Sequence, residues 1–274
     1  MKKERINIAN NTLQILDKGF YEIDTKQVNV ANQVATSISN ATLYNPDQLT
    51  GLLDRVELNK NNETKIIVTN ESTLNAAKTW VQVVEKLGVL NFASAKNPGG
   101  GFMNGAQSQE ESIARSSSLY PSIDQFQEMY KHNRAYKTYL YSDYMIYSPD
   151  VVVFKNDDGD LLENPYLVDI VTSPAVNIGA ILSNKPKEMK RVEEVMLQRI
   201  DKMLGLFAEK GCENLILGAW GCGVFRNNPE DIANYFKQFL KQEGKYEGVF
   251  DTIVFAVLDR NDRGVYRAFK KLEG

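Results

Sequence analysis

The chain has 274 residues, of which 43% are hydrophobic and 24% are charged. These proportions are ordinary for a globular protein with a full core, folded as one large α/β domain or as two smaller ones. Its 32 lysine and arginine residues against 35 aspartate and glutamate residues give a formal net charge of −3, which argues against a broad nucleic-acid or membrane-binding surface. No run approaches the roughly 18 apolar residues that a membrane-spanning helix needs.

The counts of cysteine and histidine narrow the chemistry further. Cys212 and Cys222 are the only cysteines, too few for a disulfide framework or a cysteine-built zinc site, so we expect a reducing, cytoplasmic location. His132 is the only histidine and lies in a polar run far from any serine motif, which excludes a site built from several histidines and disfavours a Ser-His-Asp triad. If the chain is an enzyme, we expect it to use carboxylates as acid–base groups.

Hydrophobic patterning and turn residues predict the helices and strands in chain order. The first part should contain an amphipathic helix over 4–18, short strands between 21 and 30, and helices over 31–39 and 46–58. The second part should contain strand 65–69, helix 72–87 ended by Gly88, strand 89–92, helices 107–118 and 122–139, strands 151–154 and 166–171, helix 187–211, strand 215–218, helix 228–240, strand 252–258 and helix 263–272.

This alternation of strands and helices predicts an α/β fold. Alternating elements form a mostly parallel sheet that is covered by helices on both faces, which gives a three-layer α/β/α sandwich. No stretch has the composition of a linker. We therefore expect a single structural unit in which residues 1–60 form a helical extension packed on a core of residues 61–274.

The most informative stretch comes after the strand predicted at 89–92. It contains three consecutive glycines at 99–101 and, seven residues later, Gln-Glu-Glu at 109–111, where a helix should begin. Glycine lets backbone amides approach a ligand closely because it has no Cβ and adopts positive φ at little cost. A run of exposed amides makes a concavity that suits phosphate. Carboxylates would repel that phosphate, so we interpret one of them as a group that does chemistry on an attached sugar.

A second glycine-rich loop comes after the strand predicted at 215–218. It reads Trp-Gly-Cys-Gly-Val-Phe over residues 220–225 and leads to a predicted helix at 228. Ligands of open α/β sheets bind at the carboxyl ends of strands, so the two loops are placed to grip a diphosphate from both sides, near a helix N-terminus. Neither loop matches the P-loop or the dinucleotide-binding fingerprint.

At these residues the chain resembles a bacterial-type poly(ADP-ribose) glycohydrolase, a branch of the macrodomain fold. The family signature is three glycines and, after six to eight residues, Gln-Glu-Glu, as found here at 99–101 and 109–111. The similarity continues through 111–121 and reappears at 171–177 and 218–227, in the expected order. It covers roughly residues 65–270.

The resemblance implies a macrodomain-like sandwich that cleaves the ribose–ribose O-glycosidic bond of poly(ADP-ribose) on modified proteins and releases ADP-ribose without a metal. Glu111 would be the catalytic acid, and Glu110 would bind ribose hydroxyls at the scissile bond. The two glycine loops would hold the diphosphate, and Phe225 would orient the terminal ribose. The implied substrate-binding residues are Ser94, Asn97, Gly99, Gly100, Gly101, Gln109, Gly221, Cys222, Gly223, Val224 and Phe225.

One position departs from the family pattern. Many relatives carry Phe-Ala-Asn before the glycines, and that asparagine bonds the terminal ribose. Here Ser94 comes directly after Phe92 and Ala93, and Asn97 comes three residues later. Either Ser94 and Asn97 share the task, or the ribose is held differently.

The residues themselves support the same chemistry. Glycoside cleavage needs a proton for the leaving oxygen and stabilisation of an oxocarbenium-like centre. Glu110 and a bound diphosphate would place negative charge beside Glu111, which favours the protonated form that a general acid needs. Glu111 would then protonate the leaving ribose hydroxyl and afterwards activate water.

Simpler explanations and other functions stay open. The paired glutamates also suit a helix N-terminus on electrostatic grounds alone. Cys222 has no histidine nearby to activate it, so we expect a packing role, and we expect Trp220 in the core. The alternative functions are a non-catalytic ADP-ribose-binding macrodomain, favoured by Ser94, and a mono-ADP-ribosyl hydrolase acting on protein or nucleic acid.

Overall fold

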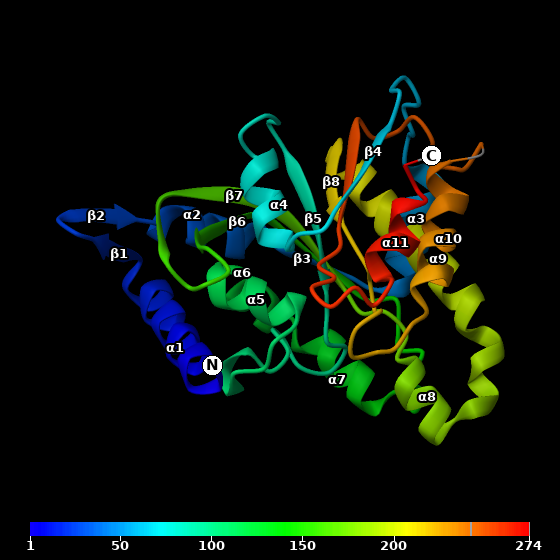
Figure 1. The fold of residues 1–274 in the computed structure, drawn as a ribbon, viewed down its shortest axis with the longest axis horizontal. Coiled ribbons are helices and arrows are strands. Elements are labelled where there is room, and N and C mark those ends of the chain that lie inside the picture. The colour runs from blue at the N-terminus through cyan, green and yellow to red at the C-terminus, as the bar shows by residue number, and fades with distance from the viewer. Residues whose placement is uncertain (242, 274) are drawn as a thin grey trace.

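A mixed seven-stranded sheet runs through the centre of the computed structural model, which describes residues 1–241 and 243–273 (Figure 1). The sheet order is β3-β6-β7-β5-β8-β9-β4, with antiparallel pairing from β3 to β7 and parallel pairing from β7 to β4. Its strands are β3 (Thr42–Tyr44), β4 (Lys65–Thr69), β5 (Leu87–Phe92), β6 (Met145–Lys155), β7 (Leu161–Ser173), β8 (Asn214–Leu217) and β9 (Thr252–Ala256). A separate hairpin pairs β1 (Phe20–Ile23) with β2 (Lys26–Asn29).

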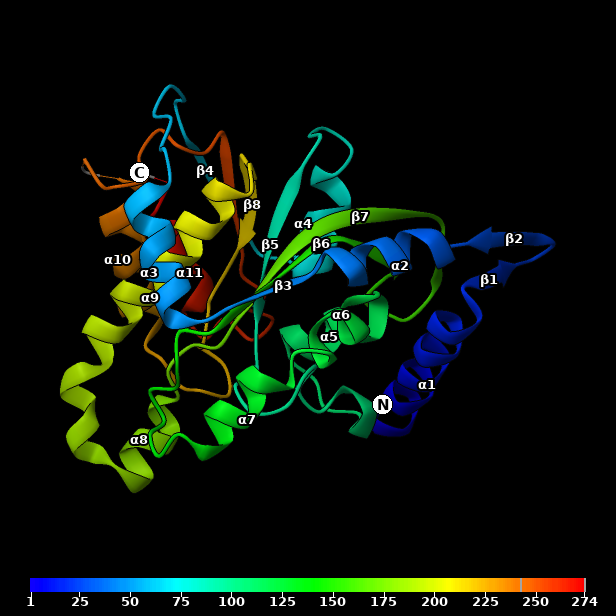
Figure 2. The same ribbon diagram turned by 180° about the vertical axis from the view of Figure 1, so that it is seen from behind.

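Helices cover both faces of this sheet, as Figures 1 and 2 show from opposite sides. One layer contains α3 (Pro46–Arg55), α9 (Val192–Glu209), α10 (Pro229–Leu240) and α11 (Val265–Lys270), and the other contains α4 (Thr73–Trp80), α5 (Gln109–Ser116), α6 (Leu119–Asp124) and α7 (Gln127–Ala135). The remaining helices are α1 (Lys2–Lys18), α2 (Ala31–Asn40) and α8 (Ile178–Asn184), with 3-10 turns at Phe102–Asn104 and Pro186–Arg191. The predicted three-layer sandwich is confirmed. None of the described helices is both long and apolar enough to cross a bilayer.

The two halves of the core result from the period of two along each strand. On β9, Ile253 and Phe255 face the cluster that contains α9 and α10, whereas Val254 faces the cluster that contains α5 and α6. Successive strand residues point to opposite faces, so an unbroken apolar strand fills both layers at once.

The N-terminal residues are joined to the core by sheet pairing and by buried polar contacts. Strand β3 pairs with β6, so residues before the predicted boundary at 60 contribute to the same sheet. Helix α1 is held by Lys155, which is 1% exposed and whose Nζ donates to the carbonyl of Ile8 at 3.1 Å and to Thr12 Oγ1 at 2.7 Å. Burial lowers the pKa of Lys155 to about 8.

The helix predicted over 72–87 is wrong in its second half. Helix α4 begins as expected, with the Ser72 side chain accepting from the Asn75 amide at 3.1 Å, but it ends at Trp80. Gly88 does not stop a helix, because it lies inside β5. A Cβ there would sit 2.8 Å from Leu215 Cδ2 and from the Phe207 ring, so this glycine serves close packing of α9 on the sheet.

Other predicted boundaries are also misplaced. The single helix predicted over 122–139 is two helices, α6 and α7, separated at Phe126, whose φ of −97° and ψ of 59° are not helical. The helix predicted from 187 begins as a 3-10 turn and becomes α9 only at Val192. Strands β6 and β7 are longer than predicted because a register shift after Ser148 lets β6 continue past Pro149. Strand β3 and helix α8 were not predicted.

We expect Gly88→Val to lower the free energy of unfolding by about 1–3 kcal/mol, because the added carbons overpack a core with no free space. Gly51→Ala is the matched control, since a Cβ there meets nothing within 4 Å in the middle of α3. We expect this control to raise stability by about 0.5–1 kcal/mol. Urea unfolding measures both, and equal stability of Gly88→Val and the wild type would contradict the packing role.

Candidate active site

The carboxyl ends of the parallel strands open on a cavity of about 1410 Å³. Its walls come from the start of α1, the first glycine loop (residues 93–101), the first turn of α5, the second glycine loop (residues 218–227) and the segment after β9. Every predicted site residue lines this cavity except Gly99, which is buried beneath it. Both predicted glycine loops therefore line one cavity.

Glu110 lies in the wall of the cavity and is only 2% exposed. Its Oε2 accepts a hydrogen bond of 2.7 Å from the Ser94 amide, and Asn91 Nδ2 lies 3.4 Å from its Oε1. Burial raises the pKa of Glu110 to about 8, with a smaller rise from the charge of Glu111, against the lowering effect of the bonds from Ser94 and Asn91. At neutral pH this carboxyl therefore holds a proton in a large fraction of molecules.

Glu111 reaches back over the triple glycine. Its Oε1 accepts from the Gly101 amide at 3.0 Å, and its Oε2 accepts from the Ser108 hydroxyl. A Cβ on Gly100 would lie 2.3 Å from Glu111 Oε1 and 3.1 Å from Glu110 Oε2, and the φ of Gly100 is +59°. Only glycine therefore lets the loop pass this closely over the two carboxyls.

The amides of the triple glycine are largely occupied by the protein itself. The Gly100 amide donates to the Asn97 carbonyl at 3.0 Å, and the Gly101 amide donates to Glu111. Ser94 Oγ accepts from the amide of Asn97 at 3.2 Å, which closes the turn and leaves the Asn97 side chain exposed at the cavity. The first loop thus positions the glutamates and presents Asn97.

The second glycine loop presents free amides. In the described part of the chain, the amides of Gly223, Val224 and Phe225 donate to no protein acceptor. Gly221 has a φ of +75°, and a Cβ there would lie 2.5 Å from Asn227 Nδ2, which fastens the base of the loop by donating to the Val176 carbonyl at 2.8 Å. This loop, with a firm base and open amides at its tip, suits a phosphate group.

Gln109 is occupied with the sheet. Its Oε1 accepts from the Phe92 amide at 2.9 Å, and its Nε2 donates to the Leu90 carbonyl at 2.7 Å. These bonds fix the first turn of α5 against the end of β5. The geometry gives Gln109 a structural task, although its side chain also borders the cavity.

Two other predictions on the second loop are answered by burial. Trp220 is fully buried and donates from Nε1 to the Ser173 carbonyl at 3.1 Å, which confirms its place in the core. Burial raises the pKa of the Cys222 thiol to about 12, so Cys222 stays a neutral thiol, which agrees with a packing role.

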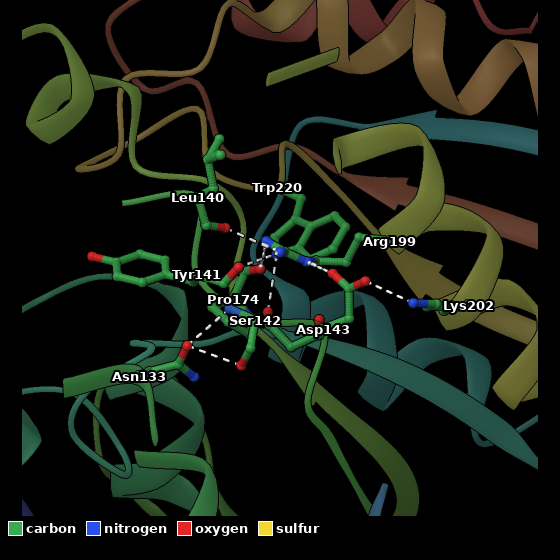
Figure 3. Close-up of polar contacts among 10 residues, drawn as sticks. Asn133, Leu140, Tyr141, Ser142, Asp143, Pro174, Arg199, Lys202 and Trp220 are labelled. Atoms are coloured by element: carbon green, nitrogen blue, oxygen red, sulfur yellow. Dashed lines mark hydrogen bonds and ion pairs between the residues drawn. The ribbon is translucent and has the colours of Figure 1, made fainter. Parts of the chain in front are cut away.

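Phe225 is supported from behind by Tyr141. A buried arginine in turn holds the Tyr141 segment, as Figure 3 shows. The Phe225 and Tyr141 rings have centroids 5.9 Å apart, and Tyr141 has a φ of +58°. Arg199 of α9 is fully buried and fixes this strained segment by donating to the carbonyls of Leu140 at 3.0 Å, Tyr141 at 3.2 Å and Pro174 at 3.0 Å.

The charge of Arg199 is compensated by Asp143. Arg199 Nε lies 2.8 Å from Asp143 Oδ1, and Lys202 Nζ lies 2.7 Å from Asp143 Oδ2. Although burial opposes ionisation, the two cations hold the pKa of Asp143 below its usual value. Every nitrogen of the guanidinium has an acceptor, so the cluster is a satisfied buried network.

Several residues that build the site were missed in the sequence. Asn91 carried a usable signal, because it is a polar residue in an otherwise apolar strand, and it is fully buried beside Glu110. Arg115 gave none, although it fixes the segment before α5 by donating to the Ala106 carbonyl at 2.7 Å and to Gln107 Oε1 at 2.6 Å. Arg5 of α1, whose Nε donates to the Gly105 carbonyl at 2.8 Å, gave none either.

Comparison with known proteins places this site in a family. The family model for microbial-type PARG, catalytic domain, matches residues 9–156. The chain belongs to the microbial-type poly(ADP-ribose) glycohydrolase family. This confirms the predicted family, its macrodomain-like fold and the expectation of a glycoside hydrolase that acts on poly(ADP-ribose).

Solved structures agree with the family model. The poly(ADP-ribose) glycohydrolase of Thermomonospora curvata is 39% identical, with a TM-score of 0.94 over 98% of this chain and 99% of that one. The same protein bound to the inhibitor ADP-HPD gives a TM-score of 0.92 at the same identity and coverage. The Deinococcus radiodurans enzyme in complex with ADP-ribose is 40% identical, with a TM-score of 0.83 over 87% of this chain and 96% of that one. No curated protein matches the chain.

We expect Glu110 to make the stability of the fold depend on pH. Its pKa is about 8 in the folded protein against an ordinary 4.5, so the folded state binds more protons between these values, and stability falls as pH rises through them. Glu110→Gln removes this titration, so its stability relative to the wild type should improve from about pH 5 to about pH 8, by on the order of a few kcal/mol.

Urea unfolding across this pH range measures the difference. Glu209→Gln is the control, because Glu209 is exposed at the end of α9 and its variant should keep the wild-type profile. Parallel profiles of Glu110→Gln and the wild type would contradict the buried titration.

We expect Arg199→Met to lower the free energy of unfolding by about 3–5 kcal/mol, because it leaves three carbonyls and one oxygen of the Asp143 carboxylate without their donor. Lys202→Met is the control, since Lys202 contacts only the second oxygen of Asp143 and is partly exposed. This control should lower the free energy of unfolding clearly less than Arg199→Met does. Urea unfolding of both variants is the measurement, and equal losses would show that the arginine is not the centre of the cluster.

Proposed function

We propose that this chain hydrolyses the ribose–ribose O-glycosidic bond of poly(ADP-ribose) attached to modified proteins and releases ADP-ribose, with Glu111 as general acid and then general base. The observation that carries the proposal is the pair of buried carboxyls that are hydrogen-bonded to the glycine loop at the cavity wall. Neighbouring elements fix both side chains before substrate arrives, as an acid–base catalyst requires. A cytoplasmic location is also proposed, with the two free cysteines in its support.

The two carboxyls act as a coupled pair. Both approach the position of a Cβ on Gly100. Burial, and to a smaller extent the nearby charge of Glu111, raise the pKa of Glu110, so Glu110 holds a proton near neutral pH. Ribose hydroxyls that donate to Glu110 stabilise its ionised form. The proton is then available at Glu111, which transfers it to the oxygen that leaves the scissile ribose.

The loops bind the rest of the terminal ADP-ribose unit. The free amides of Gly223, Val224 and Phe225 take the diphosphate, which helps to stabilise the positive charge that develops on the ribose. The Phe225 ring packs on that ribose from a position supported by Tyr141. Asn97 offers its exposed amide to the ribose hydroxyls, while Ser94 holds the turn and binds Glu110 through its backbone. After the rest of the polymer has left with the proton from Glu111, Glu111 accepts a proton from the water that attacks the ribose.

We expect Glu111→Gln to lower release of ADP-ribose from purified poly(ADP-ribose) by about 10²–10⁴-fold, because the amide cannot supply a proton. Binding of ADP-ribose, measured by calorimetry, should stay within a few-fold of the wild type. Glu209→Gln should be fully active, which controls for loss of a glutamate as such.

A fully active Glu111→Gln variant would remove Glu111 from the mechanism. Binding of ADP-ribose by the wild type without release from the polymer would instead support a non-catalytic reader or an enzyme for single ADP-ribose units. Hydrolysis assays on a protein that carries a single ADP-ribose unit distinguish the reader from the enzyme for single units.

A further inference from the structure

A strongly basic surface lies beside the catalytic cavity. It consists of residues 131–137 at the end of α7 and residues 185–191 after α8. Together these segments contain seven lysine and arginine residues and one glutamate, Glu188, in a chain whose formal net charge is −3. Seven basic residues and one acidic residue give these two segments a formal net charge of +6, so the rest of the chain carries −9.

Direct contacts bring the two segments together. Lys185 Nζ donates to the Lys137 carbonyl, and Thr138 Oγ1 donates to Glu188 Oε2 at 2.6 Å. Helices α7 and α8 lie next to each other at the lower edge of the molecule in both views (Figures 1 and 2). Glu188 also lies 3.8 Å from Lys185, so the one carboxylate of this surface already has partners.

The other cations of this surface lack anionic partners. Within the described residues, five exposed side chains make no hydrogen bond or ion pair: Lys131, Lys137, Lys187, Lys190 and Arg191. A solvated charged face is the common explanation for such residues. Like charges held close together repel, however, and an incoming polyanion relieves that repulsion.

The two helices that lead into the basic surface contact the glycine loops, α7 the first loop and α8 the second. Arg134 Nη1 donates to the carbonyl of Lys96, which lies between Ser94 and Asn97 in the first loop. At the start of α8, the Gly179 amide donates to the Phe225 carbonyl at 3.1 Å. The Arg226 side chain lies against Gly179, since a Cβ there would be 3.1 Å from Arg226 Cδ, and so continues the positive charge from the second loop to α8.

We propose that this basic surface binds the diphosphates of the poly(ADP-ribose) chain beyond the unit being cleaved. The inference rests on the proposed function, which places the scissile ribose beside Ser94 and Asn97. The next unit then leaves the site past Lys96 and α7, and each further unit carries a negatively charged diphosphate. Such contacts read charge rather than base identity, and they make this chain an enzyme for polymer rather than for single units.

The test compares the wild type with the variant Lys187→Gln/Lys190→Gln/Arg191→Gln in the full chain. kcat/KM is measured on long poly(ADP-ribose) and on a chain of two units, between about 50 and 200 mM salt. Each phosphate contact contributes about 0.7 to the slope of log kcat/KM against log salt. The triple variant should therefore lose about 2 from the slope on long polymer, through KM and not kcat.

Matched measurements separate this inference from the proposed function. Activity on the two-unit chain and affinity for ADP-ribose should be nearly unchanged in the triple variant. Lys26→Gln/Lys65→Gln/Lys78→Gln removes three exposed lysines elsewhere and should behave as the wild type on long polymer. A wild type that is inactive on every polymer tested would refute the proposed function itself.

Two outcomes would overturn the inference alone. One is an active wild type whose salt dependence on long polymer is shared by the triple variant. The other is displacement of the polymer from the inactive Glu111→Gln variant by single-stranded poly(A) as efficiently as by unlabelled polymer, which would mark a general nucleic-acid surface. Weak displacement by poly(A) would support a basic surface that is aligned with the catalytic cavity.

Discussion

The contact between two buried carboxyls and the backbone of the first glycine loop is the constraint on which the site depends. Glu110 binds the Ser94 amide and Glu111 binds the Gly101 amide, so each end of the loop is fixed by one glutamate. Gly100 lies so close to both carboxyls that a side chain there would clash with them. Substitution of the glycines therefore disturbs the two buried carboxyls first and the proposed phosphate binding only second, which reverses the usual interpretation of a triple-glycine motif.

The two glycine loops have different roles, although their sequences suggest the same role. The first uses its amides internally and the second leaves them free, although both come after parallel strands and end at the same cavity. The difference lies in the residues on the C-terminal side of each loop. Carboxylates at the start of α5 capture the first set of amides, whereas Asn227 captures only the base of the second loop. The free amides face the cavity that the two buried carboxyls also line.

The sequence predicted the layers and the loops, because both depend on short-range signals. Strand 65–69 was placed correctly since its isoleucine, valine and threonine residues lie between polar turns, and the glycine and glutamate positions lie at strand ends. Gly88 and Arg199 show where such reasoning stops. A glycine after a helical pattern is interpreted as a stop signal, because the sequence does not show that Phe207, over a hundred residues away, packs against it. An arginine inside a helix reads as exposed until Asp143 and three carbonyls surround it.

The formal net charge describes the chain as a whole but does not show how the charges are arranged in space. A chain with a formal net charge of −3 has no broad cationic surface, yet α7 and the segment after α8 meet in space and concentrate seven cations. They are separated by about fifty residues, which include β6 and β7, so no local window of the sequence shows the concentration. Charge at such a junction acts over roughly 10 Å at moderate salt, and Arg134 of α7 bonds directly to the Lys96 carbonyl of the first loop. Folding thus gives a weakly acidic chain a cationic side next to the loops that line the cavity, which a polyanionic substrate has to approach.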